Sequence, residues 1–498
     1  MAESKQTHFV RTEMLQPSPP PLREAGVVRW LRENLFSGWF NTILTLFGLA
    51  VIWLLVSSAL PWWLNGVWTA GSLGECREII AKTAGEGASG ACWAVVRERW
   101  HQFIFGFYPV DLWWRPVLAF CLLFAAMGPV LFAGQKRKLL ILLGAVGATI
   151  VILVTLAASA VPNEVPGQTD APFVWKLALA LSLLTIGAMM ALTAAGSGRL
   201  LWFTGLFPAL CFWLLWGGPI WVPLGALFGF VLLAAVYSAL LKRAGPGMAA
   251  GLGLIVALVW WLFIDAPVTV ALNNAIPFGL TSVQSDEFGG FLLAITIGVT
   301  AITFSLPVGI LLALGRQSDM LIVKTLCVGF IEFIRGVPLI TLLFTASLLL
   351  QYFLPPGTNF DIILRVIILV TLFAAAYLAE VIRGGLAALP RGQYEAADAL
   401  GLDYWQAQRF IILPQALKVS IPAIVSTFIG LFKDTTLVAF VGLMDPLKGV
   451  TQIVRADIDW KGIYWEPYIF VGAIFFVICF GMSRYSMYLE QKLKTDHR

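Results

Sequence analysis

The stretch QYEAADALGLDYWQAQRFIILPQAL, Gln393–Leu417, is a polar interruption in a chain that is otherwise dominated by apolar runs. Pro390 cannot occupy a helix interior, so a new helix is expected to start at or after it. The segment EAADAL favours a helix, and Gly401 stands where a helix ends in the left-handed conformation. Asp403 is a typical N-cap, and Gln406 completes a capping-box pattern with it. The stretch therefore predicts two short helices joined by a glycine turn.

The second of these helices is expected to run as far as Pro414, which can open the next apolar segment. On the outer face of the unit, Ala396 and Ala397 are small enough to let another surface approach closely. Glu395 and Asp398 add negative charge that suits a basic partner. A cytoplasmic loop with no partner is the alternative that composition leaves open.

The composition of the whole chain indicates a membrane protein. The 498 residues are 59% hydrophobic and only 12% charged, whereas soluble domains have about 25% charged residues. The apolar residues form runs long enough to cross a hydrocarbon layer of about 30 Å, which predicts an all-α polytopic fold. The net charge of +5 needs no nucleic acid to explain it, because Lys and Arg gather in the loops expected to be cytoplasmic.

The pattern of apolar runs predicts about twelve transmembrane helices and six regions. The predicted spans are 39–61, 115–133, 139–160, 173–195, 200–217, 222–241, 248–265, 289–314, 321–354, 361–384, 416–440 and 466–484. The predicted regions are a cytoplasmic tail with an interfacial helix (1–38), a first span (39–61), an extracytoplasmic loop (62–114), additional spans (115–288), a core (289–488) containing the polar loop 391–414, and a cytoplasmic tail (489–498). For the interfacial helix, a continuation of the first span is the alternative.

Loop charges support this arrangement. The short loops expected outside, 161–172, 218–221, 266–288 and 355–360, contain no Lys or Arg, whereas the inward loops carry them. An even number of spans then places both termini in the cytoplasm. In the outward loop 62–114, Cys76 and Cys92 can pair if that face is oxidising; two free thiols are the alternative. The three histidines are isolated from one another and from any cysteine, so no metal site is expected.

Charged residues are scarce within the apolar runs before residue 288 and become frequent after it. Burying an ionised side chain in a bilayer costs about 2.5–3.5 kcal/mol on insertion scales, so such residues need partners or a polar cavity. The pair Glu332 and Arg335 is expected near the middle of the span 321–354, and Glu380 and Arg383 repeat its three-residue spacing. Each pair either neutralises itself and bridges helices, or contacts a polar substrate.

The segment KDTT, residues 433–436, offers a second set of polar groups within an apolar run. Lys433 and Asp434 carry both charges that a zwitterionic amino acid needs, and Thr435 and Thr436 add hydroxyl groups. These four residues, with Glu332 and Arg335, are the predicted substrate-pathway residues. A simple bridge between helices is the alternative for them as well.

The order of residues in the polar loop resembles a known family. Glu395-Ala396-Ala397, Gly401 and the later Leu413-Pro414 resemble the EAA loop of ABC-importer permeases of type I. The segments EFIRGVPLI (332–340), AAAYLAEVIRGGLAALP (374–390) and LFKDTTL (431–437) resemble polar amino acid permeases. GACWAVV (90–96) and QFIFGFYP (102–109) resemble the general L-amino-acid permeases of Gram-negative bacteria. The likeness to the core covers five spans, and the preceding seven are a departure from a minimal permease.

The resemblance implies an inner-membrane permease subunit that imports L-amino acids. It assigns Glu395, Ala396, Ala397, Gly401 and the Leu413-Pro414 pair to coupling with an ATPase. The chain has no GxxxxGK[ST] phosphate-binding loop, so no cofactor is expected in it, and ATP with Mg would bind to the partner. The implied partners are a homologous permease subunit in a heterodimer, two ATP-binding-cassette subunits and a periplasmic amino-acid-binding protein.

Two other classes of function are alternatives to an ABC-importer permease. An ion-coupled secondary amino acid transporter fits twelve spans and intramembrane charges, but it predicts an internal repeat that the charge-poor first half does not show. Uptake by the isolated chain in an ion gradient would favour it. A membrane enzyme predicts a cluster of nucleophilic or metal-binding residues, and the sequence contains none.

Overall fold

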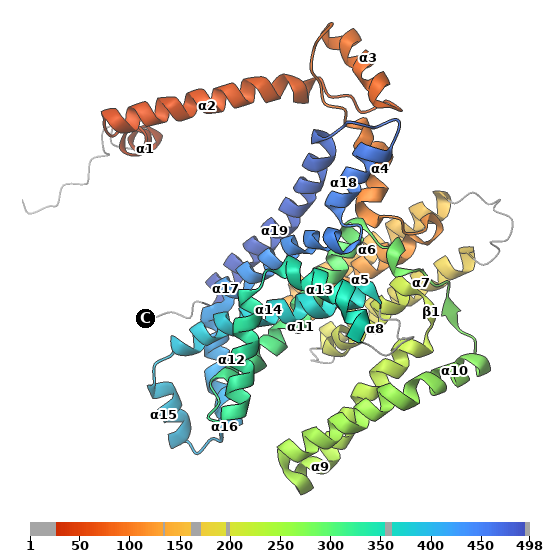
Figure 1. Cartoon of the computed structure of the whole chain (residues 1–498), viewed down its shortest axis with the longest axis vertical. Coiled ribbons are helices and arrows are strands. Elements are labelled where there is room, and N and C mark those ends of the chain that lie inside the picture. The colour runs from red at the N-terminus through yellow and green to blue at the C-terminus, as the bar shows by residue number, and fades with distance from the viewer. Residues whose placement is uncertain (1–25, 133–134, 161–170, 196–199, 354–360, 494–498) are drawn as a thin grey trace, which may run out of the picture. The chain divides into compact units, whose positions relative to one another are not determined.

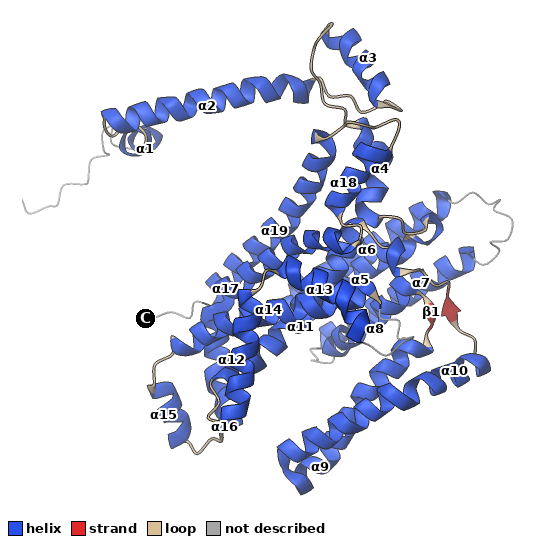
Figure 2. Cartoon of the chain, in the orientation of Figure 1, coloured by secondary structure: helices blue, strands red, loops and turns tan. Residues whose placement is uncertain are grey.

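The computed structural model describes residues 26–132, 135–160, 171–195, 200–353 and 361–493 (Figure 1). The chain divides into two units, 1–95 and 96–498, which are described separately. Helices make up nearly all of the regular structure (Figure 2). Within the described residues, the only named strands are β1 (Gly218–Pro219) and β2 (Gly279–Leu280), which pair antiparallel. The fold is all-α, as the sequence predicts.

The first unit contains three helices and a disulfide. These helices are α1 (Gly26–Asn34), α2 (Trp39–Leu64) and α3 (Leu73–Ala84). A turn separates α1 from α2, so α1 is not a continuation of the first span. Cys76 on α3 is bonded to Cys92, with their Cα atoms 6.1 Å apart. The part of the predicted cytoplasmic tail that precedes Gly26 lies outside the described residues.

The first half of the second unit is a group of packed helices followed by a helical hairpin. The group consists of α4 (Ala94–Phe105), η2 (Val110–Leu112), α5 (Trp114–Leu131), α6 (Lys136–Ala160), α7 (Ala171–Ala195) and α8 (Leu201–Trp216), with α5 packed against α6 and α8. The hairpin is formed by α9 (Trp221–Val259), the π-helix η4 (Trp260–Ile264) and α10 (Asp265–Ala275). Gly245 has φ +75°, which bends α9 into two antiparallel arms.

The second half is the permease-like core. Its helices are η5 (Ser285–Glu287), α11 (Gly290–Arg316), α12 (Leu321–Gly336), α13 (Leu339–Phe353), α14 (Ile362–Ala387), α15 (Gly392–Ala399), α16 (Tyr404–Ala407), η6 (Gln408–Ile412), α17 (Leu413–Asp434), η7 (Thr435–Val441), α18 (Pro446–Ala456) and α19 (Trp465–Leu493). The helix α14 is central, because it packs against α11, α12, α13 and α17. Small residues permit this close packing: Gly309 on α11 lies against Leu378 of α14, and Gly385 of α14 lies against Ser420 of α17.

Helix lengths do not confirm the count of twelve spans. Eight helices among the described residues are long and apolar enough to cross a membrane, or nine if one bent pair counts as a span. The predicted spans 139–160, 173–195 and 200–217 correspond to α6, α7 and α8, which are helical but fall outside that set. The helix α8 has only 16 residues, and α6 and α7 are described only in part.

The prediction of one continuous span over 321–354 is wrong. The chain bends by 102° between α12 and α13. The cause is Pro338, which has no N–H to donate and which forces the residue before it out of the helical region. Val337 accordingly has an extended backbone, with φ −108° and ψ 133°. The predicted last span, 466–484, lies within α19, and this helix continues to Leu493.

Hydrogen bonds join the additional helices to the core. At one end of α14, the Trp216 indole donates to Ser285, and the Ser285 hydroxyl donates to Asp361, which caps α14. Near the C-terminus, the Tyr485 hydroxyl donates to the Leu131 carbonyl at 2.7 Å. One cluster of buried apolar residues includes residues from both sides of residue 288. The predicted boundary at 288 therefore marks a change in composition within one packed unit.

Candidate functional site

The polar loop folds as its sequence predicts around Gly401. The first helix, α15, ends at Ala399, and Gly401 takes φ +69°. Its N–H donates to the Asp398 carbonyl at 2.9 Å, and the Leu402 N–H donates to the Ala397 carbonyl at 3.2 Å. These two bonds form a Schellman motif, which satisfies carbonyls at the helix end. The predicted glycine turn is confirmed.

The predicted capping box is also present. The Asp403 carboxylate accepts from the Gln406 N–H at 2.9 Å, and the Gln406 side chain accepts from the Asp403 N–H at 3.2 Å. This arrangement fixes the start of α16. A side-chain hydrogen bond of 2.9 Å from Gln415 to Gln393 then ties α17 to α15. The turn is therefore held at both of its ends.

The predicted break at Pro414 is wrong. The helix α16 continues through η6 into α17, so the second helix of the loop and the following span form one continuous helix. Proline removes one helical hydrogen bond and crowds the carbonyl four residues earlier. The wider π-turn of η6, over residues 408–412, places an extra residue there and absorbs that strain.

The exposure of one of the two alanines in the loop differs from the prediction. Ala396 is exposed as expected, but Ala397 is only 1% exposed and faces the interior of the loop. Adjacent helical residues point about 100° apart, so both cannot lie on one docking face. The large apolar residues exposed in the loop are instead Leu400, Tyr404, Trp405 and Phe410, at 72%, 52%, 62% and 65% exposure. Two neighbouring aromatic residues in an otherwise polar loop are the signal in the sequence that indicates this surface.

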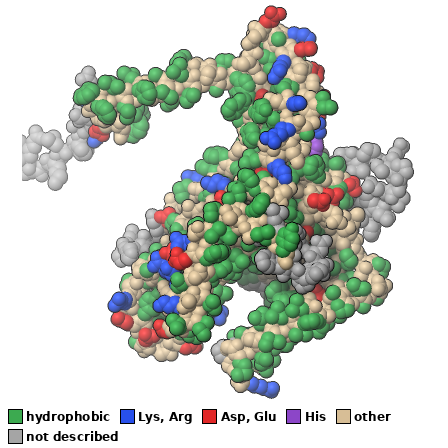
Figure 3. Space-filling view, viewed as in Figure 1, with side chains coloured by type: hydrophobic (Ala, Val, Ile, Leu, Met, Phe, Trp, Pro, Cys, Tyr) green, Lys and Arg blue, Asp and Glu red, His purple; other side chains and the backbone are tan. Residues whose placement is uncertain are grey.

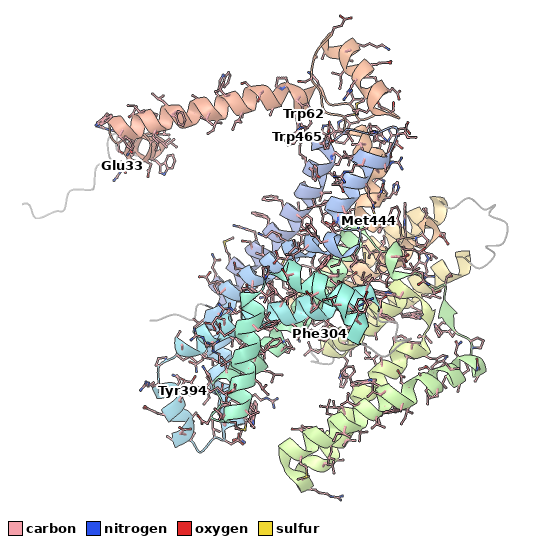
Figure 4. The ribbon with its side chains drawn as sticks, in the orientation of Figure 1. Glu33, Trp62, Phe304, Tyr394, Met444 and Trp465 are labelled. Carbon is pink, nitrogen blue, oxygen red and sulfur yellow. A yellow bond between two sulfur atoms is a disulfide. The ribbon has the colours of Figure 1, made fainter. Side chains whose placement is uncertain are left out.

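The surface around this loop is charged and partly apolar. Figure 3 shows acidic and basic side chains gathered at the end of the unit that carries α15 and α16, whereas the α9–α10 hairpin is mostly apolar. Tyr394 lies on α15 (Figure 4), and burial raises the pKa of its hydroxyl, so it remains protonated at neutral pH. Exposed aromatic residues beside charges are typical of protein–protein contact sites.

Glu332 and Arg335, the charged residues predicted within the span 321–354, belong to a cluster between three helices. Arg316, at the end of α11, contacts Glu332 of α12 at 2.9 Å and Glu380 of α14 at 3.3 Å. Arg335 contacts Glu380 at 3.8 Å, and the Arg383 Nε donates to Glu380 at 2.9 Å. The predicted Glu380–Arg383 pair is confirmed. Glu332 and Arg335 lie at the end of α12 rather than in the middle of a span, and each has its ion-pair partner on another helix.

A pocket of about 270 Å³ lies between α14 and α17. It is lined by Phe373, Ala374, Tyr377, Thr427, Gly430, Leu431 and Asp434. Asp434 is its only ionised lining residue, and no hydrogen bond or salt bridge to its carboxylate is found within the described ranges. A carboxylate without a hydrogen bond or salt bridge in a small, mostly apolar pocket is suited to binding an ammonium group.

The other three residues of the KDTT segment lie outside this pocket. Lys433 is exposed and does not line it. The Thr435 hydroxyl donates to the Phe432 carbonyl at 2.7 Å, and the Thr436 hydroxyl donates to the Lys433 carbonyl at 2.9 Å. These threonines support the end of α17. The structure therefore brings Asp434 into the pocket alone, and the residues that accompany it there, Tyr377 and Thr427, were not predicted.

Comparisons with known proteins point to one kind of membrane protein. A family model described as binding-protein-dependent transport system inner membrane component matches residues 305–495. The glutamate/glutamine/aspartate/asparagine transport system permease protein BztC of Rhodobacter capsulatus is 60% identical over 493 residues, which is 99% of each chain. The inner membrane amino-acid ABC transporter permease protein YhdY of Escherichia coli K12 is 34% identical over 96% of each chain.

A solved structure is similar to part of this chain. The crystal structure of an amino acid ABC transporter with histidines has 30% sequence identity and covers 40% of this chain and 91% of that chain, with a TM-score of 0.36. The two relatives match the chain over nearly its full length, including the residues before 289.

Proposed function

This chain belongs to the inner membrane components of binding-protein-dependent transport systems and is an amino-acid permease subunit of an ABC transporter, and we propose that it imports glutamate, glutamine, aspartate and asparagine. BztC, to which this chain is 60% identical, is named as a transporter of these four amino acids. It is a multi-pass protein of the inner membrane, and it is not an enzyme. Family membership implies a separate ATPase and a binding protein as partners.

In the finer arrangement that we propose, the chain pairs with a homologous permease subunit, and two ATP-binding-cassette subunits bind from inside, where ATP and Mg are held. Both termini are cytoplasmic. The observation that supports coupling to the ATPase is the geometry of the loop around Gly401. This loop has a Schellman turn and a capping box, and its second helix continues without a break into α17. Glu395, Ala396 and the exposed Leu400, Tyr404 and Trp405 contact the ATPase.

Substrate passage is assigned to the pocket between α14 and α17. Asp434 receives the ammonium group of the amino acid, and Tyr377 and Thr427 offer hydroxyl groups at the same pocket. The pocket and the loop share two helices, because α14 precedes the loop and α17 follows it. Movement of the loop therefore changes the two walls of the pocket together.

Affinity purification followed by reconstitution tests this function. We expect an ATPase subunit to co-purify with the chain, and we expect the vesicles to take up glutamate and glutamine only with ATP inside and loaded binding protein outside. Uptake by the chain alone in an ion gradient, without a co-purifying ATPase, would contradict the proposal. Replacement of Trp405 by alanine should weaken ATPase co-purification, whereas replacement of the exposed Trp202 on α8 should not.

A further inference from the structure

Three residues on one face of α14 connect the pocket to the charged cluster. Phe373, Tyr377 and Glu380 follow at intervals of four and three residues, so they stack along one side of the helix. Phe373 and Tyr377 line the pocket, and their ring centroids are 4.8 Å apart. Glu380, which forms ion pairs in the charged cluster, lies about one turn further along α14 towards the polar loop. An amino acid that leaves the pocket along this face towards the loop meets the cluster next.

Arg335 is the member of the cluster that lies beside the pocket. Its guanidinium carbon is 5.8 Å from the ring centroid of Tyr377, which lines the pocket. Its contact with Glu380, at 3.8 Å, is the longest of the ion pairs in the cluster. Glu380 already accepts from Arg383 at 2.9 Å and from Arg316 at 3.3 Å. Glu380 would therefore remain paired if Arg335 turned to another carboxylate.

The net positive charge of the cluster favours an anionic ligand. Three guanidinium groups face two carboxylates among the described residues of the cluster, which leaves positive charge in excess. Arg335 is 33% exposed, so it is accessible yet partly removed from water. A guanidinium group binds a carboxylate through two parallel hydrogen bonds, which a neutral amide cannot reproduce with the same strength.

We propose that Arg335 binds the side-chain carboxylate of an anionic amino acid as it leaves the pocket, exchanging Glu380 for the substrate, and so favours glutamate and aspartate over their amides. This inference rests on the proposed function, because it assumes that the acidic amino acids and their amides both pass through the chain. Asp434 binds the ammonium group that all four substrates share, so it does not distinguish them. Arg335 binds the side-chain carboxylate, which is the charged group that glutamate has and glutamine lacks.

The test compares these two nearly isosteric substrates in the complete transporter. Vesicles carrying the permease, its ATPase and saturating loaded binding protein are assayed for uptake of labelled glutamate and glutamine. The binding protein is the same throughout, so its own preference cancels when a variant is compared with the unsubstituted chain. Arg335→Gln should lower the glutamate-to-glutamine rate ratio at least tenfold, and Arg335→Lys should lower it less.

Two further variants separate this role from general damage to the cluster. Arg383→Gln removes a guanidinium that bonds the same Glu380 but has no contact with Tyr377, so both substrates should be affected equally. Glu380→Gln removes the competing carboxylate and should raise the ratio. If Arg335→Gln leaves the ratio unchanged while both substrates are transported, the inference is wrong and the proposed function stands. If the unsubstituted transporter takes up neither amino acid, the proposed substrate range fails, and the inference fails with it.

Discussion

Asp434 is the residue on which substrate binding in the proposed pocket depends most directly. It is the only ionised residue of the pocket lining, and a hydrogen bond to a charged group contributes about 1.5–3 kcal/mol. Asp434→Asn keeps the shape but removes the charge, so uptake of every substrate should fall about ten- to hundredfold. Radiolabelled uptake in vesicles measures this, with ATPase co-purification as the check on assembly.

The neighbouring lysine provides the matched control. Lys433 is exposed and lies outside the pocket lining, although the sequence predicts a joint role for both residues. Lys433→Gln should therefore retain most of the uptake. Normal transport by Asp434→Asn, or an equal loss from both substitutions, would show that the carboxylate does not bind substrate.

At the scale of the element, the coupling loop depends on the backbone conformation of Gly401. A residue with a Cβ pays about 1–2 kcal/mol in the left-handed region, and Gly401 has φ +69° with open space around it. Gly401→Ala should therefore weaken the turn without any steric clash, and it should reduce the amino acid transported per ATP hydrolysed. Gly392, at the start of α15, also has open space but lacks a positive φ. Gly392→Ala should leave this coupling ratio unchanged; equal ratios in the two variants would contradict the role of the turn.

The contact between α14 and α17 depends on Gly385. A Cβ at this position would lie 2.6 Å from the Ala416 carbonyl oxygen and would collide with the Ser420 side chain. Gly385→Ala should therefore separate the two helices and cost about 1–3 kcal/mol of stability. The adjacent Gly384 has no atom within 4 Å of a Cβ, so Gly384→Ala should be tolerated. Thermal unfolding of the purified permease compares the two, and the same midpoint for both would show that this contact tolerates a methyl group.

Local signals in the sequence predicted much of the coupling loop. Gly401, Asp403 and Gln406 act on their own neighbours, so a turn and a capping box can be inferred from spacing alone. The bend before α13 had an equally local signal in Pro338, but average hydropathy over 321–354 concealed it. The π-turn before Pro414 could not be inferred, because a helix can meet a proline by ending, kinking or widening.

Contacts between helices were beyond the sequence. Glu332 and Arg335 share a spacing that predicts a pair, yet their partners are Arg316 and Glu380 on other helices. Only the packing of α11, α12 and α14 decides which partner is nearer. The pocket is a similar case: Asp434 was predicted from its charge, whereas Tyr377 and Thr427 join it only because α14 and α17 pack together.

At the scale of the whole molecule, the disulfide lies in the segment 62–114, which the sequence predicts to face outward. Cys76 and Cys92 are separated by 16 residues, and closing a loop of about that size contributes about 3 kcal/mol in the chain-entropy model. Cys76→Ser should therefore destabilise the region around α3. In the intact chain, alkylation of the unfolded protein should add two more adducts after reduction than before it. An equal number of adducts with and without reductant would show that the two thiols are free.

The junction between the outward loop and the core depends on glycines that bring two backbones together. Gly106, just after α4, bridges to Phe288, and Gly290 donates its N–H to the Met444 carbonyl at 2.7 Å. Met444 is labelled at this junction in Figure 4. A Cβ on Gly106 would lie 2.6 Å from the nitrogen of Gly289. Backbone atoms cannot move aside as side chains do, so a substitution there must shift the loop or α11.

Gly106→Ala should therefore destabilise the permease far more than Gly87→Ala. Both glycines have positive φ, +70° and +86°, so both substitutions carry the left-handed penalty of about 1–2 kcal/mol. Gly87 has no atom within 4 Å of a Cβ, and the difference between the variants isolates the backbone contact. Thermal unfolding in detergent, with gel filtration to detect aggregates, measures that difference. If the two variants unfold at the same temperature, the outward loop does not help to hold the first turn of α11 in place. A lower midpoint for Gly106→Ala alone would make residues 96–113 a structural part of the permease core.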